Sequence, residues 1–250
     1  MEVDPESNLI MSEAEVLKKL EKHLNVPLKA IRWVHDRGYL EISKQVVSLH
    51  LQGLGVFELP DFITKFEKLR EINLSAFYLD DDGIKPENQI QAIDLTFLQD
   101  LKHFERLFLS NNRLTTLDLT PLKSCPNLKK IHLYSNQLKE IDLRPLAQCS
   151  LLQLLDLSNN ELQTIDLTPL ANCKDFEDLM LDSNQLEAID LTPLRSLNKL
   201  NLLHLSSNNI TQIDCTPLIG LTKLEYFLID KKVKPKDSRQ SESFFLKMTK

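Results

Sequence analysis

The sequence predicts an α/β solenoid, in which stacked units share one parallel β-sheet. Three observations support this fold class: a repeat of fixed length, a strand pattern inside each repeat, and a turn-and-helix pattern in its other half. Six consecutive 24-residue units cover residues 90–233 and begin at Ile90, Leu114, Leu138, Leu162, Leu186 and Ile210. A fixed period over several units is typical of solenoids, in which each unit packs only against its neighbours.

Each unit contains one short strand with a buried face. In one unit, Ile131 and Leu133 alternate with Lys130, His132 and Tyr134, which is the period of a half-buried strand. A single unit cannot bury its own apolar side, so neighbouring units stack about 4.8 Å apart in a parallel ladder. An asparagine follows each strand, and we expect its amide to satisfy backbone groups in a buried turn. These residues are Asn88, Asn112, Asn136, Asn160, Asn184 and Asn208.

The other half of each unit reads I-D-L-T-P-L and predicts a turn followed by a short helical segment. Thr-Pro pairs such as Thr120-Pro121 and Thr168-Pro169 predict a helix N-cap followed by proline at the first helical position. Phe97 replaces the proline in one unit and Arg144 replaces the threonine in another, so we expect these two helices to be less well capped. The aspartates of the motif are interpreted as turn acceptors near solvent. They are Asp94, Asp118, Asp142, Asp166, Asp190 and Asp214.

The consensus L-x-x-I-D-L-T-P-L-x-x-C/L-x-x-L-x-x-L-x-L-x-x-N-x contains the pattern L-x-x-L-x-L-x-x-N-x-L and resembles the leucine-rich repeat family. The resemblance covers residues 46–230, and the first repeats are similar to those of prokaryotic and archaeal members. It implies a right-handed horseshoe with the parallel β-sheet on its concave face. It also implies a protein that binds another protein.

The two ends of the repeat array carry different signals. Residues 1–45 are expected to form a capping helix and the segment that leads into the repeats, since Ser12 and Glu15 form a capping box that Met11 and Val16 bracket as a hydrophobic staple. Residues 231–250 form a basic tail with seven basic and two acidic residues. A basic tail can contact nucleic acid or an acidic membrane, and this is the alternative function that the sequence leaves open.

Composition limits the class of protein. The chain has 250 residues, of which 42% are hydrophobic and 26% charged, and its net charge is −6. It contains no apolar run of about 18 residues that would span a membrane, and its acidic start has no apolar signal region. We therefore expect a cytoplasmic monomer.

The cysteines and one inserted loop are candidates for metal or redox chemistry. Cys125, Cys149 and Cys173 occupy a position that leucine fills in other units, so we interpret them, with Cys215, as reduced core residues. The insertion that contains Asp80–Gly83 lacks the spacing of a calcium-binding loop. We expect no metal and no cofactor.

Function must lie in the positions that the repeat leaves free, which are the outward side chains of the stacked strands. Apolar and aromatic residues occupy many of these positions beside charges of both signs, as a protein-binding surface requires. The sequence therefore predicts a partner-binding surface and a partner that is a protein rather than nucleic acid. Its predicted residues are Arg106, Phe108, Lys130, His132, Tyr134, Leu154, Asp156, Asp178, Met180, Asp182, Leu202, His204 and Tyr226.

A catalytic function is another alternative to this interpretation. His132, Asp156 and Ser158 come from adjacent units and could lie within reach of one another. A catalytic triad also needs a nucleophile on its base, an oxyanion hole and a pocket, and the sequence has no motif for these. We therefore expect a binding module and not an enzyme.

Overall fold

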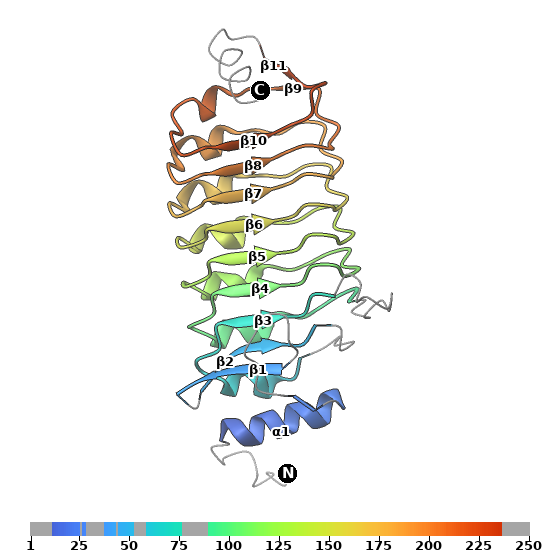
Figure 1. Cartoon of the computed structure of the whole chain (residues 1–250), viewed down its shortest axis with the longest axis vertical. Coiled ribbons are helices and arrows are strands. Elements are labelled where there is room, and N and C mark those ends of the chain that lie inside the picture. The colour runs from blue at the N-terminus through green and yellow to red at the C-terminus, as the bar shows by residue number, and fades with distance from the viewer. Residues whose placement is uncertain are drawn as a thin grey trace, which may run out of the picture.

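The computed structural model describes residues 12–25, 27–28, 38–43, 45–52, 59–76 and 90–236. Within these residues, nine strands form one sheet in the order β1-β2-β3-β4-β5-β6-β7-β8-β10, and the units stack along the long axis of the molecule (Figure 1). From β2 to β10 every pair of neighbours is parallel. The predicted parallel ladder is therefore confirmed.

The repeats supply short strands of three residues each, joined in register from unit to unit. They are β3 (Glu71–Asn73), β4 (Arg106–Phe108), β5 (Lys130–His132), β6 (Leu154–Asp156), β7 (Asp178–Met180), β8 (Leu202–His204) and β10 (Tyr226–Leu228). The middle residue of each strand is buried in the core, as Leu107, Ile131 and Leu155 illustrate with no exposed surface. Its two neighbours point outward, so the alternation predicted for a half-buried strand is present.

Short 3₁₀ helices lie on the other side of the units, and in the six regular units they coincide with the I-D-L-T-P-L motif (Figure 1). They are η2 (Asp61–Lys65), η3 (Thr96–Asp100), η4 (Thr120–Ser124), η5 (Arg144–Gln148), η6 (Thr168–Asn172), η7 (Thr192–Ser196) and η8 (Thr216–Leu218). Their leucines, together with those of the strands, form one continuous core. Cys125, Cys149, Cys173 and Cys215 lie in this core as buried free thiols.

The prediction that threonine caps these helices is wrong. The N-cap residue is the preceding leucine, Leu119 in η4, and it makes no side-chain capping bond. Instead, the aspartate two residues before the threonine accepts the threonine N–H, at 2.8 Å between Asp118 Oδ1 and Thr120 N. The helices that begin at Thr96 and Arg144 have the same bond, because their aspartates are also present. Thr96 N lies 2.8 Å from Asp94 Oδ1, and Arg144 N lies 2.9 Å from Asp142 Oδ1. The expectation that those two starts are less well capped is therefore also wrong.

The asparagine after the strand fulfils its predicted role at all five of its described positions. Asn160 Nδ2 donates to the backbone oxygens of Leu133 and Leu157 at 3.0 and 3.1 Å, while its Oδ1 accepts from Leu138 N at 3.1 Å. Each asparagine thus connects its own unit to the preceding one. Equivalent bonds occur at Asn112, Asn136, Asn184 and Asn208. Asn88 lies outside the described residues.

The N-terminal end begins with α1 (Glu13–Leu24), whose capping box between Ser12 and Glu15 is formed as predicted. Val16 and Leu20 are fully buried, and α1 lies against η2. The strand β1 (Gly38–Ile42), which the sequence did not reveal, pairs antiparallel with β2 (Gln45–His50) and begins the sheet. Met11, the other half of the predicted staple, lies outside the described residues.

The C-terminal end adds a second, smaller ladder on the helix-bearing side. The strand β11 (Lys234–Pro235) pairs in parallel with β9 (Gln212–Ile213). Val233, directly before β11, is buried and belongs to the core. The rest of the basic tail lies outside the described residues. No helix in the described part of the chain combines the length and the apolar character that a membrane span needs.

Candidate interaction surface

The outward side chains of the sheet form three columns, which we call the strand face. Strand register places Arg106 beside Lys130, Lys130 beside Leu154, and so on from unit to unit. The first column is Ser48, Glu71, Arg106, Lys130, Leu154, Asp178, Leu202 and Tyr226, and the second is His50, Asn73, Phe108, His132, Asp156, Met180, His204 and Leu228. The third column lies two residues after the second and includes Tyr134, Ser158 and Asp182.

Most of the predicted site residues lie on this face with part of their surface open. Tyr226 is 53% exposed, and Leu228 beside it, which the prediction omitted, is 41% exposed. The half-buried residues are Arg106, Phe108, Lys130, His132, Tyr134, Asp178, Met180, Asp182, Leu202 and His204.

Two predicted residues are buried although they point outward. Leu154 is 9% exposed and Asp156 is 6% exposed. Both stand on β6 in the middle of the ladder, where side chains of β5 and β7 flank them in register. They support the face from within and offer a partner little surface, which corrects the expectation that they are exposed.

A buried ionic network occupies the N-terminal end of the strand face. Glu71 accepts from His50 Nε2 at 2.7 Å between nitrogen and Oε1, and its other oxygen is bonded to Arg106 Nε. Burial alone would raise the pKa of Glu71, but the hydrogen bonds from His50 and Arg106 outweigh it and hold that pKa below its usual value. Arg106 is therefore partly committed to its own chain, which the sequence did not reveal.

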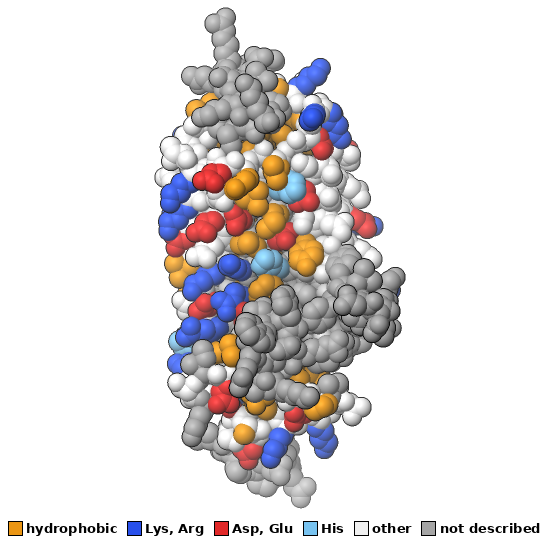
Figure 2. Space-filling model, in the orientation of Figure 1, with side chains coloured by type: hydrophobic (Ala, Val, Ile, Leu, Met, Phe, Trp, Pro, Cys, Tyr) orange, Lys and Arg blue, Asp and Glu red, His pale blue; other side chains and the backbone are white. Residues whose placement is uncertain are grey.

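Basic side chains gather at the level of β3, β4 and β5, along one edge of the sheet (Figure 2). Glu105 lies among them, with its Oε2 2.9 Å from Lys129 Nζ and its Oε1 3.7 Å from Arg70 Nη1. Lys130 makes no ion pair with any described residue. Because one glutamate is shared by several cations, this edge keeps an excess of positive charge.

The rings of Phe108 and His132 stack in the middle of the face, with centroids 4.7 Å apart and planes 10° from parallel. His132 Nδ1 lies 3.9 Å from Asp156 Oδ2. Ser158 Oγ donates to the other oxygen of Asp156 at 2.7 Å. The serine hydroxyl is thus bonded to the carboxylate and not to the histidine, which differs from the arrangement of a catalytic triad.

The C-terminal half of the face combines carboxylates with apolar side chains. Asp182 Oδ1 lies 3.0 Å from His204 Nδ1. Met180 lies between Asp156 and His204 in register, and Asp178 lies between Leu154 and Leu202. Figure 2 shows acidic and hydrophobic side chains gathered over β6, β7 and β8.

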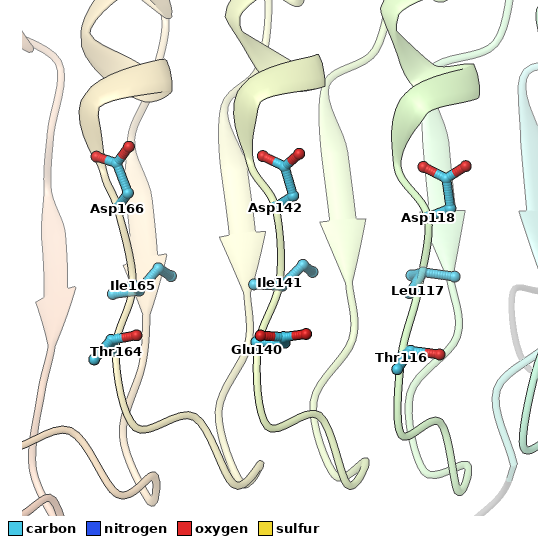
Figure 3. A pocket seen from close by; sticks show the side chains of 9 residues that line it. All are labelled: Thr116, Leu117, Asp118, Glu140, Ile141, Asp142, Thr164, Ile165 and Asp166. Atoms are coloured by element: carbon cyan, nitrogen blue, oxygen red, sulfur yellow. The ribbon is translucent and has the colours of Figure 1, made fainter.

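A groove of about 580 Å³ lies on the opposite, helix-bearing side of three neighbouring units (Figure 3). Its wall includes half-buried Ile141 and Ile165 and a column of aspartates beside the starts of the 3₁₀ helices (Figure 3). Hydrogen bonds from the Thr168 hydroxyl and backbone N–H lower the pKa of Asp166, and Arg144 does the same for Asp142. These carboxylates accept hydrogen bonds within their own turns.

Within the described residues, no group of three or more His, Cys, Asp or Glu side chains could hold a metal ion. The Asp80–Gly83 loop lies outside the described residues, as does most of the basic tail.

A stack of parallel strands with a conserved turn in each unit and an open sheet face defines a solenoid repeat protein. Comparison with known families gives matches to leucine-rich repeats at residues 105–147 as a two-copy unit, at residues 151–173 and at residues 176–231. No curated protein sequence matches the chain.

Solved structures of related fold extend this result. Internalin C2 of Listeria monocytogenes is 30% identical, and the match covers 74% of this chain and 80% of that one with a TM-score of 0.50. A leucine-rich repeat protein of Leptospira interrogans is 22% identical with a TM-score of 0.65, and the match covers 92% of this chain but only 62% of that protein. The ectodomain of the Arabidopsis thaliana receptor kinase GASSHO1/SCHENGEN3 is 22% identical with a TM-score of 0.59, over 80% of this chain and 26% of that one.

The chain belongs to the leucine-rich repeat family. Modules of this family generally mediate protein–protein interaction.

Proposed function

We propose that this protein is a non-catalytic binding module that recognises another protein through its strand face, which we infer to be the concave side of the solenoid. One observation carries the proposal: apolar and aromatic side chains stay open at outward positions, where an idle, solvated face would be polar. They include Phe108, Tyr134, Met180, Leu202 and Tyr226, which are half-buried or exposed.

The contacts within the face support this function because they fix the side chains in place before a partner arrives. Phe108 is held by its stacking on His132, and Tyr134 Oη accepts a hydrogen bond from Asn111 Nδ2 at 3.3 Å. Ordering side chains on binding costs about 0.5–1.5 kcal/mol for each flexible one. A face that is already ordered avoids part of that cost.

Charge adds direction to this surface. A basic edge lies beside β3–β5, and carboxylates lie among apolar side chains over β6–β8 (Figure 2). Complementary charges speed association and exclude partners with the wrong pattern. We expect the apolar residues to supply most of the affinity.

We further propose that the module acts as a cytoplasmic monomer. The four cysteines support the compartment, since all are free thiols in the core, as is usual for proteins in a reducing environment. Sedimentation equilibrium of the purified chain tests the monomer. A mass that rises toward the dimer value at micromolar concentration would contradict it.

Affinity capture from a lysate of the source cells tests the binding surface. The wild type is compared with the double variant Phe108→Glu/Met180→Glu, which places charges on the strand face. The matched control is Leu151→Glu/Ile219→Glu, since these two exposed apolar residues, at 37% and 43% exposure, lie outside the three columns. Circular dichroism first establishes that all three proteins are folded.

We expect a protein that wild type and control retain and that the strand-face variant loses. With the purified partner, the dissociation constant of the strand-face variant should rise about 100-fold, the loss typical of central interface residues. If all three proteins retain the same partner equally, the proposed binding surface is contradicted.

A further inference from the structure

The C-terminal half of the strand face has an alternating pattern that specifies more than a general binding surface. In the first column, Leu154, Asp178 and Leu202 are neighbours in register on β6, β7 and β8. In the second column the order is reversed, with the carboxylate of Asp156 beside Met180. Apolar groups and carboxylates therefore alternate in both directions across these strands.

The carboxylate of Asp178 is the outward one in these strands that stays partly open to solvent, since Asp156 is buried. Asp178 is half-buried, and its carboxylate makes no hydrogen bond or ion pair with any described residue. Glu177 and Glu225 precede β7 and β10 and are exposed. No Lys or Arg occupies an outward position of β6, β7, β8 or β10 among the described residues. Lys199 precedes β8 and is bonded to Asp175 at 2.6 Å, while Lys223 precedes β10 and is exposed.

The N-terminal half of the face has the opposite character. Arg70, Arg106 and Lys129 lie there with Glu105 as their shared counter-charge, and Lys130 has no ion pair with a described residue. The only outward carboxylate of β3–β5, that of Glu71, is buried and paired. A positively charged segment would thus be repelled from β3–β5 and attracted to β6–β10. Each half of the face therefore disfavours a ligand whose charge suits the other half.

We propose that β6, β7, β8 and β10 bind an extended segment of a partner protein in which basic side chains alternate with aliphatic or aromatic ones. The inference rests on the proposed function and deepens it by stating the chemistry of the partner. A basic group of that segment pairs with Asp178 on β7, and the exposed Glu177 and Glu225 add negative charge beside it. Its apolar groups cover Met180, Leu202 and the exposed side chains of Tyr226 and Leu228.

The spacing of the strands sets the length of this segment. Neighbouring strands lie about 4.8 Å apart, and an extended chain advances about 3.4 Å per residue. About five residues, laid along the stacking axis, therefore reach from β6 to β10. A segment of this length can order on the face without a fold of its own.

Fluorescence anisotropy with three synthetic peptides tests the inference. The first peptide, of about eight residues, alternates Lys with Leu and Phe. The second replaces each Lys by Glu, and the third keeps Lys but replaces the apolar residues by Ser. We expect the first peptide to bind more tightly than either of the others by about tenfold, and its affinity to fall with added salt. Equal binding of all three peptides, or binding of none, would overturn the inference.

A pair of charge reversals locates the peptide. Asp178→Lys changes the charge on the strand face, while Glu187→Lys makes the same change at an exposed position on the opposite side. We expect Asp178→Lys to weaken the first peptide about tenfold and Glu187→Lys to leave its affinity unchanged. If both variants weaken it equally, the attraction is a property of net charge alone and the inference is wrong.

The two proposals fail in different ways. If Phe108→Glu/Met180→Glu loses the cellular partner while Asp178→Lys retains it at full affinity, the strand face binds a protein but the partner's chemistry is not the one inferred here. If the peptide binds at Asp178 while Phe108→Glu/Met180→Glu retains every cellular partner, the proposed function fails and the peptide site stands apart from it.

Discussion

At the scale of single residues, the repeated asparagine is the strongest polar determinant of the fold. Asn160 replaces backbone hydrogen bonds that the tight turn after the strand cannot form. Its Nδ2 donates to the backbone oxygens of Leu133 and Leu157, and its Oδ1 accepts from Leu138 N. All of these groups are buried. A buried polar group that loses its partner costs about 1–3 kcal/mol.

Asn160→Ala should therefore lower the free energy of unfolding by about 3 kcal/mol, because it leaves several backbone groups without partners in a dry turn. Urea denaturation followed by circular dichroism measures the change. Asn172→Ala is the control, since Asn172 is exposed at the end of η6, and it should shift stability by less than about 0.5 kcal/mol. Equal effects of the two substitutions would contradict the assigned role.

The aspartate column connects the helix starts to pH. Hydrogen bonds from Thr168, first from its hydroxyl and then from its backbone N–H, lower the pKa of Asp166 below its ordinary value of 3.8. A carboxyl group with a depressed pKa in the folded state contributes stability above its unfolded pKa and loses it as the pH falls through the folded pKa.

The difference in urea midpoint between wild type and Asp166→Asn should thus be constant from neutral pH down to about pH 5 and shrink below the ordinary pKa. The variant removes only the charge, so the amide oxygen can still accept the turn bond. A series of urea titrations between acidic and neutral pH measures the difference. A gap that widens as the pH falls would show that Asp166 has a raised pKa in the folded protein.

At the scale of elements, α1 is the one α-helix that the described residues contain, and its start is defined by a reciprocal pair of bonds. Ser12 N donates to Glu15 Oε2 at 2.7 Å, and Glu15 N donates to Ser12 Oγ at 3.4 Å. The helix also contacts the sheet directly, since Glu13 Oε2 accepts from Val46 N at 2.6 Å. Its start therefore determines how well the first unit is covered.

Ser12→Ala should destabilise the first turn of α1 by about 1 kcal/mol, which lowers hydrogen-exchange protection of its amides about fivefold. Exchange at the amides of β6 should not change, because no unit between them depends on this cap. Ser12→Asp restores an acceptor at the N-cap and should recover the protection. If Ser12→Asp behaves like Ser12→Ala, the capping bond is not the cause.

The sequence predicted the elements well where the repeat is regular and less well where local chemistry is ambiguous. The positions of β4 to β8, the buried asparagines and the column order all follow from the phase of the 24-residue unit. The Thr-Pro pair was misinterpreted, because the same two residues fit threonine either as the N-cap or as the first residue of the helix. Only the hydrogen bond from Thr120 N to Asp118 distinguishes the two positions. The antiparallel strand β1 lies before the repeat and had no pattern to reveal it.

The strand face was predicted in outline but not in its internal bonds. Register placed Phe108 beside His132, yet the stacking of their rings depends on rotamers that no sequence pattern encodes. Glu71 and Arg106 are 35 residues apart across the irregular unit, so their ion pair could not be found from the 24-residue spacing. The burial of Asp156 depends on the sizes of its neighbours.

At the scale of the whole molecule, the stacking of nearly identical units makes the solenoid modular. Deleting one complete unit, residues 138–161, should leave a folded protein because the unit before and the unit after present equivalent surfaces to each other. The dependence of unfolding free energy on urea should fall by about a tenth, in proportion to the surface lost. Circular dichroism and a urea titration measure both.

Deleting half a unit, residues 138–149, is the comparison. It removes a 3₁₀ helix but leaves a strand, so the remaining unit cannot register with its neighbours. We expect this protein to unfold at much lower urea concentration. If the two deletions are equally stable, the 24-residue unit is not the structural module.

The direction of the ladder also determines how the molecule would respond to force. The inter-strand hydrogen bonds run along the long axis, and α1 and β11 lie at its opposite ends (Figure 1). Tension between these ends would therefore break the inter-strand hydrogen bonds one pair of strands at a time, and would not break those of the whole sheet together. Each of the regular 24-residue units would release about 85 Å of chain as it opens. A single-molecule extension trace should show small, evenly spaced steps at low force, so that the protein could lengthen under load without losing its remaining units.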